Sequence, residues 1–222
     1  MKAMILAAGF GTRLKPLTDT LPKALVPYKN LPMISRQIHR LKSAGISEIV
    51  VNVHHFPEKM VSFFKENDFG IKINLSIEEE ILGTGGGILN AKDFLENEDY
   101  FAVINVDVET DFNIKELIDY TLETTSDAVL AVQKRNTRRG LTFDGNMMMT
   151  GLQNESSDAD TVYAFNCMHV ISSDIFRQGY EVKFSGIFDL YLDMTGKGKQ
   201  ISGYDTGDCF FKDLGKVENL QS

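Results

Sequence analysis

The sequence has 222 residues, of which 43% are hydrophobic, and it carries a net charge of −8. This length and composition suit a globular protein with one sizeable core or two small ones. The acidic balance argues against a general affinity for nucleic acid or anionic membranes, so any anion that the protein binds must meet a local cationic site.

The first 134 residues alternate apolar, strand-like runs with segments of helical periodicity. Strands are predicted at 3–6, 48–53, 71–77, 100–106 and 128–132, and helices at 33–43, 58–66, 86–95 and 114–122. Two of these helices have an apolar face, made of Ile34, Ile38 and Leu41 in one and of Leu117, Ile118 and Leu122 in the other. The alternation predicts an α/β fold with a mostly parallel sheet that helices cover on both sides.

After residue 134 the pattern changes. The run LTFDGNMMM predicts a β-hairpin around Asp144 and Gly145, and the polar, acidic segment 152–161 predicts a loop. The runs TVYAFNCMHVI and SGIFDLYLDM predict a buried strand and a helix. Because no linker or internal repeat interrupts the chain, we expect a single domain over residues 1–222 with two halves, 1–134 and 135–222.

The two cysteines, Cys167 and Cys209, have no metal-ligand spacing and are too few for a disulfide scaffold, so we expect reduced thiols. The N-terminus has no signal-peptide pattern, and no apolar run has the length of a membrane span. From these features we expect a cytoplasmic, soluble protein that binds neither nucleic acid nor membrane.

The stretch LAAGFGTRLKPLTDTLPKALVP, residues 6–27, follows the first predicted strand. In an open parallel sheet, ligands bind outside the carboxyl ends of the strands. Gly9 and Gly11 allow a turn whose amides approach an anion closely. Arg13 offers a planar fork for phosphate oxygens, and Lys23 offers a compact point charge. This segment therefore predicts an anion-binding loop.

Two familiar glycine motifs do not fit this loop. A dinucleotide fingerprint needs a third glycine where the chain has Leu14, and a P-loop needs Gly-Lys-Ser/Thr where it has Gly-Thr-Arg. The whole stretch instead closely resembles the opening signature of the sugar-1-phosphate nucleotidyltransferases. Within that family the chain is most similar to short bacterial muramic-acid-1-phosphate uridylyltransferases and mannose-1-phosphate guanylyltransferases.

The resemblance implies a Rossmann-like, three-layer α/β/α nucleotidyltransferase fold with a mostly parallel, mixed central sheet. Residues 1–134 would form the nucleotide-binding half, and residues 135–222 the sugar-binding half. The implied reaction converts an NTP and a sugar 1-phosphate to an NDP-sugar and pyrophosphate by in-line displacement.

The resemblance also assigns roles to the residues of the first loop. The turn that contains Ala8, Gly9, Gly11 and Thr12 would, with Arg13, hold the β- and γ-phosphates that leave. Lys23 would steady the α-phosphate and the incoming sugar phosphate. Arg13 and Lys23 are therefore the expected catalytic residues.

Two aspartates are the candidate ligands of a magnesium ion. Asp107 follows the buried run YFAVIN, and Asp213 lies in FFKDLGKVENL between a short predicted strand and a predicted final helix. Mg²⁺ prefers one or two carboxylates together with phosphate oxygens and water. The residues alone leave a second interpretation open, in which Asp107 caps a turn and Asp213 caps the final helix. The resemblance favours the metal role for both. Asp111 is a further candidate ligand and ranks below Asp107.

Two positions depart from the family pattern. Val106 stands where the family has glycine before its metal-binding aspartate, so that either the sugar space is narrowed or Val106 points into the core. In FNCMHV, Asn166 and Cys167 stand where relatives often have serine and glycine. The nucleotide-side motifs are therefore intact, whereas the sugar-side motifs differ.

A second glycine-rich stretch, EEEILGTGGGI, is expected to read the base. By family analogy Gly83 and Thr84 would contact the base through their backbone, and Glu78 would bond its edge. An ionised carboxylate only accepts hydrogen bonds, which favours the ring N–H of UTP, dTTP or GTP over CTP. Asn105 matches a family position that contacts substrate. The adjacent His54 and His55 are expected to support a loop rather than bind metal.

Two other functions remain open at the level of the sequence. A phosphocholine cytidylyltransferase uses the same opening motif with a different acceptor. A non-catalytic nucleotide-sugar-sensing domain would keep the fold without the reaction. The sequence determines neither the sugar, the pathway nor the oligomeric state.

Overall fold

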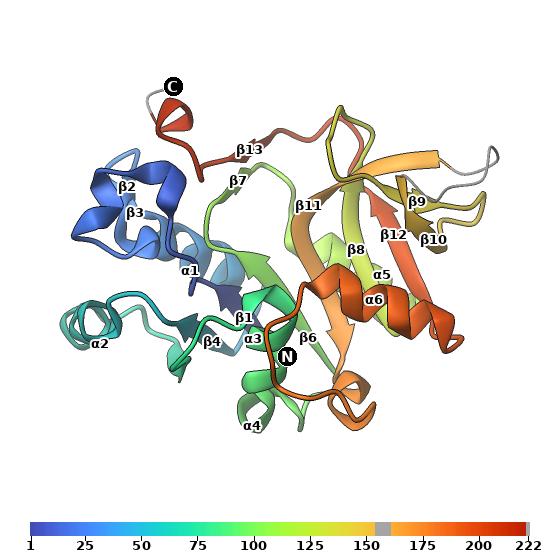
Figure 1. Cartoon of the computed structure of the whole chain (residues 1–222), viewed down its shortest axis with the longest axis horizontal. Coiled ribbons are helices and arrows are strands. Elements are labelled where there is room, and N and C mark those ends of the chain that lie inside the picture. Colours follow the sequence, from blue (N-terminus) through green and yellow to red (C-terminus); the bar gives the residue numbers. More distant parts are fainter. Residues whose placement is uncertain (154–160, 221–222) are drawn as a thin grey trace.

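The computed structural model describes residues 1–153 and 161–220. Among these residues, nine strands form one central sheet, which begins with four parallel strands (Figure 1). These are β1 (Lys2–Leu6), β4 (Glu48–Val53), β5 (Lys72–Ile77) and β6 (Tyr100–Asn105), in the order β6-β1-β4-β5. Each of the predicted strands in this region is present within about one residue. The carboxyl ends of β1 and β6 lie side by side, because Leu6 pairs with Asn105.

The second half of the sheet is mixed and is organised around one long strand, β11 (Thr161–Ser172). It pairs antiparallel with β6, with β8 (Ala128–Gln133) and with β9 (Leu141–Phe143). Strand β12 (Ile201–Asp205) pairs parallel with β8, and β10 (Met149–Leu152) closes the predicted hairpin with β9. The sheet is therefore parallel in its first half and mixed in its second.

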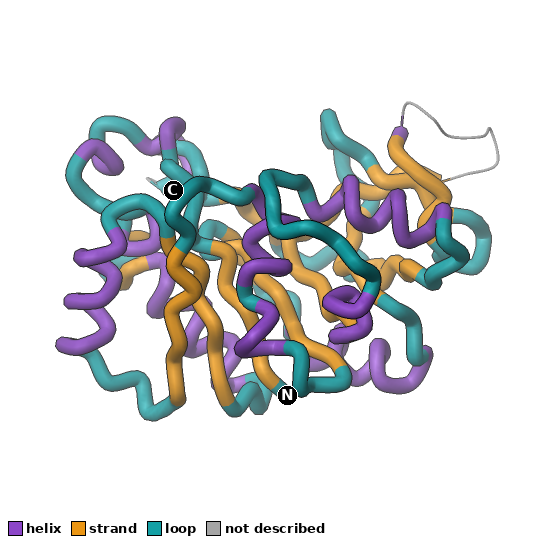
Figure 2. Tube along the Cα trace, turned by 60° about the horizontal axis from the view of Figure 1, so that its bottom comes forward, coloured by secondary structure: helices purple, strands orange, loops and turns teal. Residues whose placement is uncertain are grey.

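Helices cover both faces of this sheet, as Figure 2 shows. The core on one face joins α1 (Met33–Ser43), α2 (Pro57–Glu66) and α5 (Ile114–Thr124) to the sheet. The core on the other face joins α3 (Gly83–Asn90), α4 (Lys92–Leu95) and α6 (Ile187–Gly196). The prediction of a three-layer α/β/α arrangement with a mixed sheet is confirmed. No helix of the described part of the chain is long and apolar enough to cross a membrane.

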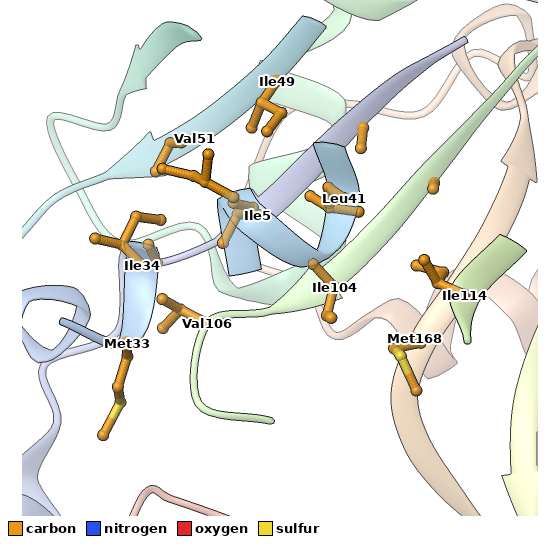
Figure 3. Packing of buried hydrophobic residues seen from close by; sticks show 14 of the residues in the cluster. Ile5, Met33, Ile34, Leu41, Ile49, Val51, Ile104, Val106, Ile114 and Met168 are labelled. Carbon is orange, nitrogen blue, oxygen red and sulfur yellow. The ribbon is translucent and has the colours of Figure 1, made fainter. Parts of the chain in front are cut away.

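Val106 belongs to the first of these cores. It is 1% exposed and lies beside the α1 residues Met33 and Ile34 (Figure 3). Of the two outcomes expected for this position, the structure has the second, since the side chain points into the core. The valine therefore does not narrow the space in front of Asp107.

A small two-stranded ribbon brings distant parts of the chain together. Strand β7 (Val108–Thr110) pairs antiparallel with β13 (Phe211–Asp213), and the Leu214 amide donates to the Asp107 carbonyl over 2.8 Å. A second ribbon joins β2 (Pro27–Tyr28) to β3 (Leu31–Pro32) before α1. The ribbon of β7 and β13 fixes the position of the C-terminal segment beside the end of β6. Figure 1 shows this ribbon near the upper edge of the molecule.

Several predicted elements differ from the structure. The helix expected at 86–95 begins at Gly83 and divides into α3 and α4, and the expected final helix is a 3-10 turn over Val217–Asn219. Leu122 is 51% exposed because α5 packs through positions 114, 117, 118 and 121, and position 122 lies past that stripe. Most of the loop expected at 152–161 lies outside the described residues.

Candidate active site

The loop after β1 forms an exposed turn above the carboxyl ends of the sheet. Gly11 has a φ of 64°, in the left-handed region that favours glycine. Its carbonyl accepts hydrogen bonds from the Leu14 amide and the Thr18 hydroxyl, each over 2.8 Å. Gly9 and Thr12 are exposed in the same turn, whereas the preceding Ala8 is buried. The chain then passes through 3-10 turns at Thr12–Leu14 and Leu17–Asp19, and Lys23 begins a third.

Arg13 and Lys23 are each paired with one of the predicted aspartates. The ammonium of Lys23 bonds to Asp107 Oδ2, and both side chains are largely buried. The guanidinium of Arg13 lies 3.4 Å from Asp213 Oδ2 in a more exposed position. Gln37 supports Asp107 from behind, since its amide donates to the carbonyls of Val106 and Val108. The backbone on both sides of Asp107 is thereby fixed.

Gly215 shows how closely the charged groups converge. A Cβ at this position would lie 2.7 Å from Arg13 Nη2, 2.8 Å from Asp107 Oδ2 and 2.8 Å from Asp213 Oδ1. Two carboxylates, one from the middle of the chain and one from near its C-terminal end, thus share one small space, which any side chain at residue 215 would fill. The Asp213 carboxylate is held there by the Gly215 amide, which donates to Oδ1 over 2.7 Å.

The donor set of this space suits a hard divalent cation that also binds substrate oxygens. Two carboxylates match the usual protein contribution to a Mg²⁺ site, with phosphate and water completing the coordination. Among the described residues no group of three or more His, Cys, Asp or Glu side chains is placed to hold a metal ion. A cation at Asp107 and Asp213 would therefore depend on oxygens that the protein does not supply.

Three neighbouring cavities surround Asn105, which lines each of them. The first, about 150 Å³, lies between the glycine turn and the start of α3 and is called the nucleotide cavity below. It is lined by Leu6, Ala8, Gly9, Lys23, Asn52, Ile81, Gly83, Thr84, Asn105 and Asp107. The structure thus brings together most of the residues predicted from the two glycine-rich stretches. Gly11 and Thr12 shape the turn without lining this cavity.

Glu78 does not line the nucleotide cavity. It is 3% exposed, and its carboxylate accepts hydrogen bonds from Asn52 Nδ2 over 2.7 Å and from the Leu82 amide over 3.0 Å. Asn52 in turn accepts from the Ala7 amide over 2.7 Å. This chain of bonds joins the end of β1 to the start of α3. Asn52, which was not predicted, is the side chain that lines the cavity. A polar residue near the end of the apolar run EIVVNV was the signal in the sequence that could have indicated it.

The other two cavities lie on the side of the second half. The larger, about 510 Å³, is called the metal-side cavity, because Arg13, Asp107 and Asp213 line it together with Thr137, Arg138 and Arg139. The other, about 250 Å³, is called the ring cavity and lies between β11 and α6, against Phe165, His169 and Phe188. Arg138, Arg139 and His169 were not among the residues predicted for the site. The available signal for the first two was a pair of arginines just before the predicted hairpin.

Cys167 lines both of these cavities at an irregularity in β11. Its φ is 57°, and the register with β8 shifts between Phe165 and His169. Burial, followed by the carboxylates of Asp107 and Asp213, raises the pKa of the Cys167 thiol to about 12, so it is protonated at neutral pH. The preceding Asn166 is buried and bonds to Arg135 and Thr206. The departure from the family pattern therefore places a neutral thiol at the metal-side cavity.

The adjacent histidines lie next to the glycine turn. The rings of His54 and His55 both contact Phe10 edge to face, with centroids 5.3 and 5.5 Å away. His54 Nδ1 lies 3.0 Å from the Glu78 carbonyl, and His55 Nε2 lies 3.4 Å from the Thr18 carbonyl. These contacts agree with the expected role in supporting the loop.

The family model "Nucleotidyl transferase" matches residues 2–143 of this chain. Among curated proteins, the mannose-1-phosphate guanyltransferase of Candida albicans is 49% identical over 123 residues, 54% of this chain and 34% of that protein. The probable mannose-1-phosphate guanylyltransferase 1 of Oryza sativa subsp. japonica is 44% identical over 138 residues, 60% of this chain and 38% of that protein. The chain spans little more than a third of the length of these relatives.

Solved structures match over almost the whole chain. HddC from Yersinia pseudotuberculosis, in a complex with GMP-PN, has a TM-score of 0.80 and 26% identity, with 99% of this chain and 96% of that chain covered. A putative glucose-1-phosphate thymidylyltransferase from Bacillus anthracis has a TM-score of 0.84 and 21% identity, with 100% and 92% covered. The second similarity, at this identity, concerns the fold alone.

Proposed function

Because the chain belongs to the nucleotidyl transferase family, we propose that it transfers the nucleoside monophosphate of an NTP to a sugar 1-phosphate and releases pyrophosphate. The curated relatives that support this proposal are named as mannose-1-phosphate guanyltransferases. The family model covers the part of the chain that contains the glycine turn and Asp107. A GTP and mannose 1-phosphate pair is therefore the first substrate combination to test.

One observation carries the proposal. Asp107 and Asp213 meet at Gly215 beside Arg13, and Lys23 bonds to the first of these carboxylates. Ion pairs that only stabilise the fold do not require a cavity beside them. Here both carboxylates line the metal-side cavity, and Asp107 and Lys23 line the nucleotide cavity. The arrangement fits two phosphate-bearing substrates that must be brought together against their mutual repulsion.

The reaction needs no nucleophilic side chain. An oxygen of the acceptor phosphate forms a bond to the α-phosphorus while the bond from that phosphorus to the bridging oxygen of the β-phosphate breaks. The acceptor phosphate, whose second pKa is about 6, is already ionised at neutral pH, so no general base is required. Catalysis then consists of positioning and charge stabilisation.

The residues of the first loop supply most of this stabilisation. The amides of the Gly9 turn and the Arg13 guanidinium face the leaving pyrophosphate, and Lys23 stabilises charge at the α-phosphate. Asp107 and Asp213 would hold Mg²⁺. The ion, when bound, neutralises phosphate oxygens and orients them for in-line displacement.

Arg138 and Arg139 extend this role to the acceptor. Both are exposed and line the metal-side cavity with Arg13. Within the described ranges, 1–153 and 161–220, neither guanidinium has a carboxylate within ion-pair distance. Two cations that have no carboxylate partner among the described residues, beside the carboxylate pair, fit the phosphate of the sugar 1-phosphate. They leave Lys23 free to act on the nucleotide.

The choice of nucleotide depends on the contacts of the nucleotide cavity. Glu78 acts on that cavity through Asn52 and the Leu82 amide, so its carboxylate positions the two loops that enclose the base. The expected preference for UTP, dTTP or GTP over CTP can no longer rest on a bond between the Glu78 carboxylate and the base, because that carboxylate is bonded to Asn52 and the Leu82 amide. GTP stands first because the relatives are named guanyltransferases.

The decisive experiment is a pyrophosphate-release assay over a panel of NTPs and sugar 1-phosphates with Mg²⁺. Turnover that needs an NTP together with a sugar 1-phosphate, and that stops with excess EDTA, is the expected result. Turnover of CTP with phosphocholine instead would identify a phosphocholine cytidylyltransferase. Tight binding of a nucleotide sugar without any turnover would identify a sensing domain. Either of these results would contradict the proposal.

A further inference from the structure

The ring cavity combines apolar walls with a few polar groups. Leu6, Phe165, Ile187 and Phe188 contribute apolar surface, and the rings of Phe165 and Phe188 meet edge to face with centroids 5.5 Å apart. Its polar lining residues are Thr84, Asn105, Arg139, His169 and Asp189. Mixed aromatic and polar linings of this kind suit a ligand with apolar faces and hydroxyl edges, such as a pyranose ring.

The proposed reaction gives the ring cavity a substrate part to hold. It adjoins the metal-side cavity, with which it shares Asn105, Arg139 and Cys167. An acceptor whose phosphate lies against Asp107 and Asp213 would therefore extend its sugar ring into the ring cavity. His169 is the polar side chain on the β11 wall of that cavity.

His169 is bonded to a buried tyrosine behind it. The two residues are 1% and 0% exposed, and the Nδ1 atom of His169 bonds to the hydroxyl of Tyr191 on α6. Burial lowers the pKa of His169 to about 3, and burial raises the pKa of Tyr191 well above its ordinary value. Both side chains are therefore neutral at physiological pH.

The Tyr191 hydroxyl determines which ring nitrogen of His169 carries the proton. Among the described residues, His169 Nδ1 is the hydrogen-bond partner recorded for this hydroxyl. A buried hydroxyl proton without an acceptor is costly, so Tyr191 donates and Nδ1 accepts. The proton of the neutral imidazole then sits on Nε2.

His169 lines the ring cavity, and Nε2 is the ring nitrogen that its bond to Tyr191 leaves available. The buried side-chain nitrogens and oxygens without a partner in the described part of the chain are Gln37 Oε1, Arg40 Nε and Ser185 Oγ. His169 Nε2 is not one of them, and no protein partner for it is present in the described ranges. It is thus an open N–H donor on the wall of an otherwise largely apolar space.

Building on the proposed function, we propose that His169 is a specificity-determining residue that donates a hydrogen bond from Nε2 to one hydroxyl oxygen of the acceptor sugar. Tyr191 is a positioning residue that fixes the tautomer. An acceptor without that hydroxyl leaves the buried donor unpaired, and such an acceptor is selected against. The ligand class is a hydroxylated pyranose 1-phosphate whose ring packs against Phe165 and Phe188.

The test uses GTP with α-D-mannose 1-phosphate and its single deoxy and deoxyfluoro analogues. One deoxy analogue is expected to lower kcat/KM about 10- to 100-fold in the wild-type protein. The fluoro analogue at the same carbon keeps part of the activity, because fluorine accepts a hydrogen bond but cannot donate one. A fluoro analogue as poor as the deoxy analogue at every carbon would overturn the proposal.

Variants assign the effect to the residue. His169→Leu is expected to lower the activity with the parent sugar to that with the deoxy analogue, while the KM for GTP stays unchanged. His169→Gln, which keeps an N–H donor, restores part of the discrimination, and Tyr191→Phe weakens it. His39→Leu, on the exposed side of α1, is the matched control. If His169→Leu and His169→Gln both discriminate as the wild-type protein does, His169 does not contact the sugar.

The same variants separate this proposal from the proposed function. Binding of α-D-mannose 1-phosphate and of the deoxy analogue is measured by calorimetry, with thermal unfolding as the check on folding. In one outcome the wild-type protein turns over no sugar but binds α-D-mannose 1-phosphate more tightly than the deoxy analogue, and His169→Leu loses this selectivity. That outcome contradicts the catalytic proposal and supports the His169 contact. A folded His169→Leu variant that turns over with undiminished selectivity has the opposite meaning, because it supports the catalytic proposal and contradicts the His169 contact.

Discussion

The candidate active site has a metal side, formed by Arg13, Lys23, Asp107 and Asp213, and an acceptor side, formed by Arg138, Arg139 and the ring cavity. The two sides differ in how their charges are compensated. On the metal side, Lys23 and Arg13 are already paired with Asp107 and Asp213. On the acceptor side, Arg138 and Arg139 have no carboxylate partner among the described residues, and the ring cavity has aromatic walls. Charge pairs at close range permit few substitutions, whereas an open cavity accepts many shapes. The paired charges of Arg13, Lys23 and their aspartates therefore permit fewer replacements than the residues that line the ring cavity.

The largest effect is expected on the metal side, from Lys23→Ala and Arg13→Ala. Each removes a cation that faces phosphate in the reaction, so kcat should fall about 10²- to 10³-fold. The nearby Lys15→Ala is the matched control, because Lys15 is exposed and pairs with Asp19. Steady-state pyrophosphate release gives the rates, and circular dichroism checks the fold. Near-native rates in either variant would remove that residue from the mechanism.

Gly215→Ala tests the same side by crowding rather than by loss of charge. The added methyl would lie within 2.8 Å of the two carboxylates and Arg13, so these groups must move apart. We expect activity to fall about tenfold or more and the Mg²⁺ requirement to rise, with little change in stability. Gly196→Ala is the control, since its Cβ would meet nothing within 4 Å. Equal behaviour of the two variants would show that the space at residue 215 is not used.

Arg138→Ala and Arg139→Ala sharpen the comparison on the acceptor side. If these cations hold the acceptor phosphate, the KM for the sugar 1-phosphate should rise about tenfold in each variant. The KM for the NTP should stay unchanged. Arg177→Ala, which removes a surface ion pair with Asp174, serves as the control. An equal rise in both KM values would place the two arginines at the nucleotide instead.

The smallest effect concerns stability and pH at the ring cavity. His169 has a pKa of about 3 in the folded protein against 6.5 when unperturbed, so the unfolded chain takes up a proton that the folded chain refuses. The free energy of unfolding should therefore decrease as the pH falls below 6.5. Between pH 7 and 5 this decrease is about 2 kcal/mol in the wild-type protein. The free energy of unfolding, measured with urea at each pH, should lack this part of the decrease in His169→Gln. If the wild-type protein and His169→Gln show the same pH dependence, His169 is not a buried, neutral imidazole in the folded protein.

Sequence reasoning predicted the elements that depend on continuous apolar runs. Strands β4 and β6 are buried on both faces, which produces the runs EIVVNV and YFAVIN. The signature and the positions after predicted strands also indicated Arg13, Lys23, Asp107 and Asp213 as candidate site residues, but not the pairing of each cation with one aspartate. The helix expected after Asp213 did not form, since Asn219 instead donates to the Asp213 carbonyl over 2.6 Å in a short 3-10 turn.

The acceptor side could not be predicted in the same way. In the sequence, His169 is one of many residues in a predicted buried strand. Its proposed role as a donor to the sugar depends on Tyr191, which lies 22 positions later on a helix. Glu78 was visible as a carboxylate, but its engagement by Asn52 depends on the parallel pairing of β4 with β5. Contacts that arise only when separate elements pack leave no periodic or local pattern in the chain.

Binding of Mn²⁺, measured by electron paramagnetic resonance with a non-hydrolysable GTP analogue, tests the central claim most directly. If Asp107 and Asp213 share one ion, Asp107→Asn and Asp213→Asn should each weaken Mn²⁺ binding about tenfold or more, because loss of even an outer-shell partner has an effect of this size. The exposed control Asp119→Asn, on α5, should bind Mn²⁺ as the wild-type protein does. Wild-type Mn²⁺ affinity in either Asp107→Asn or Asp213→Asn would contradict the shared metal site.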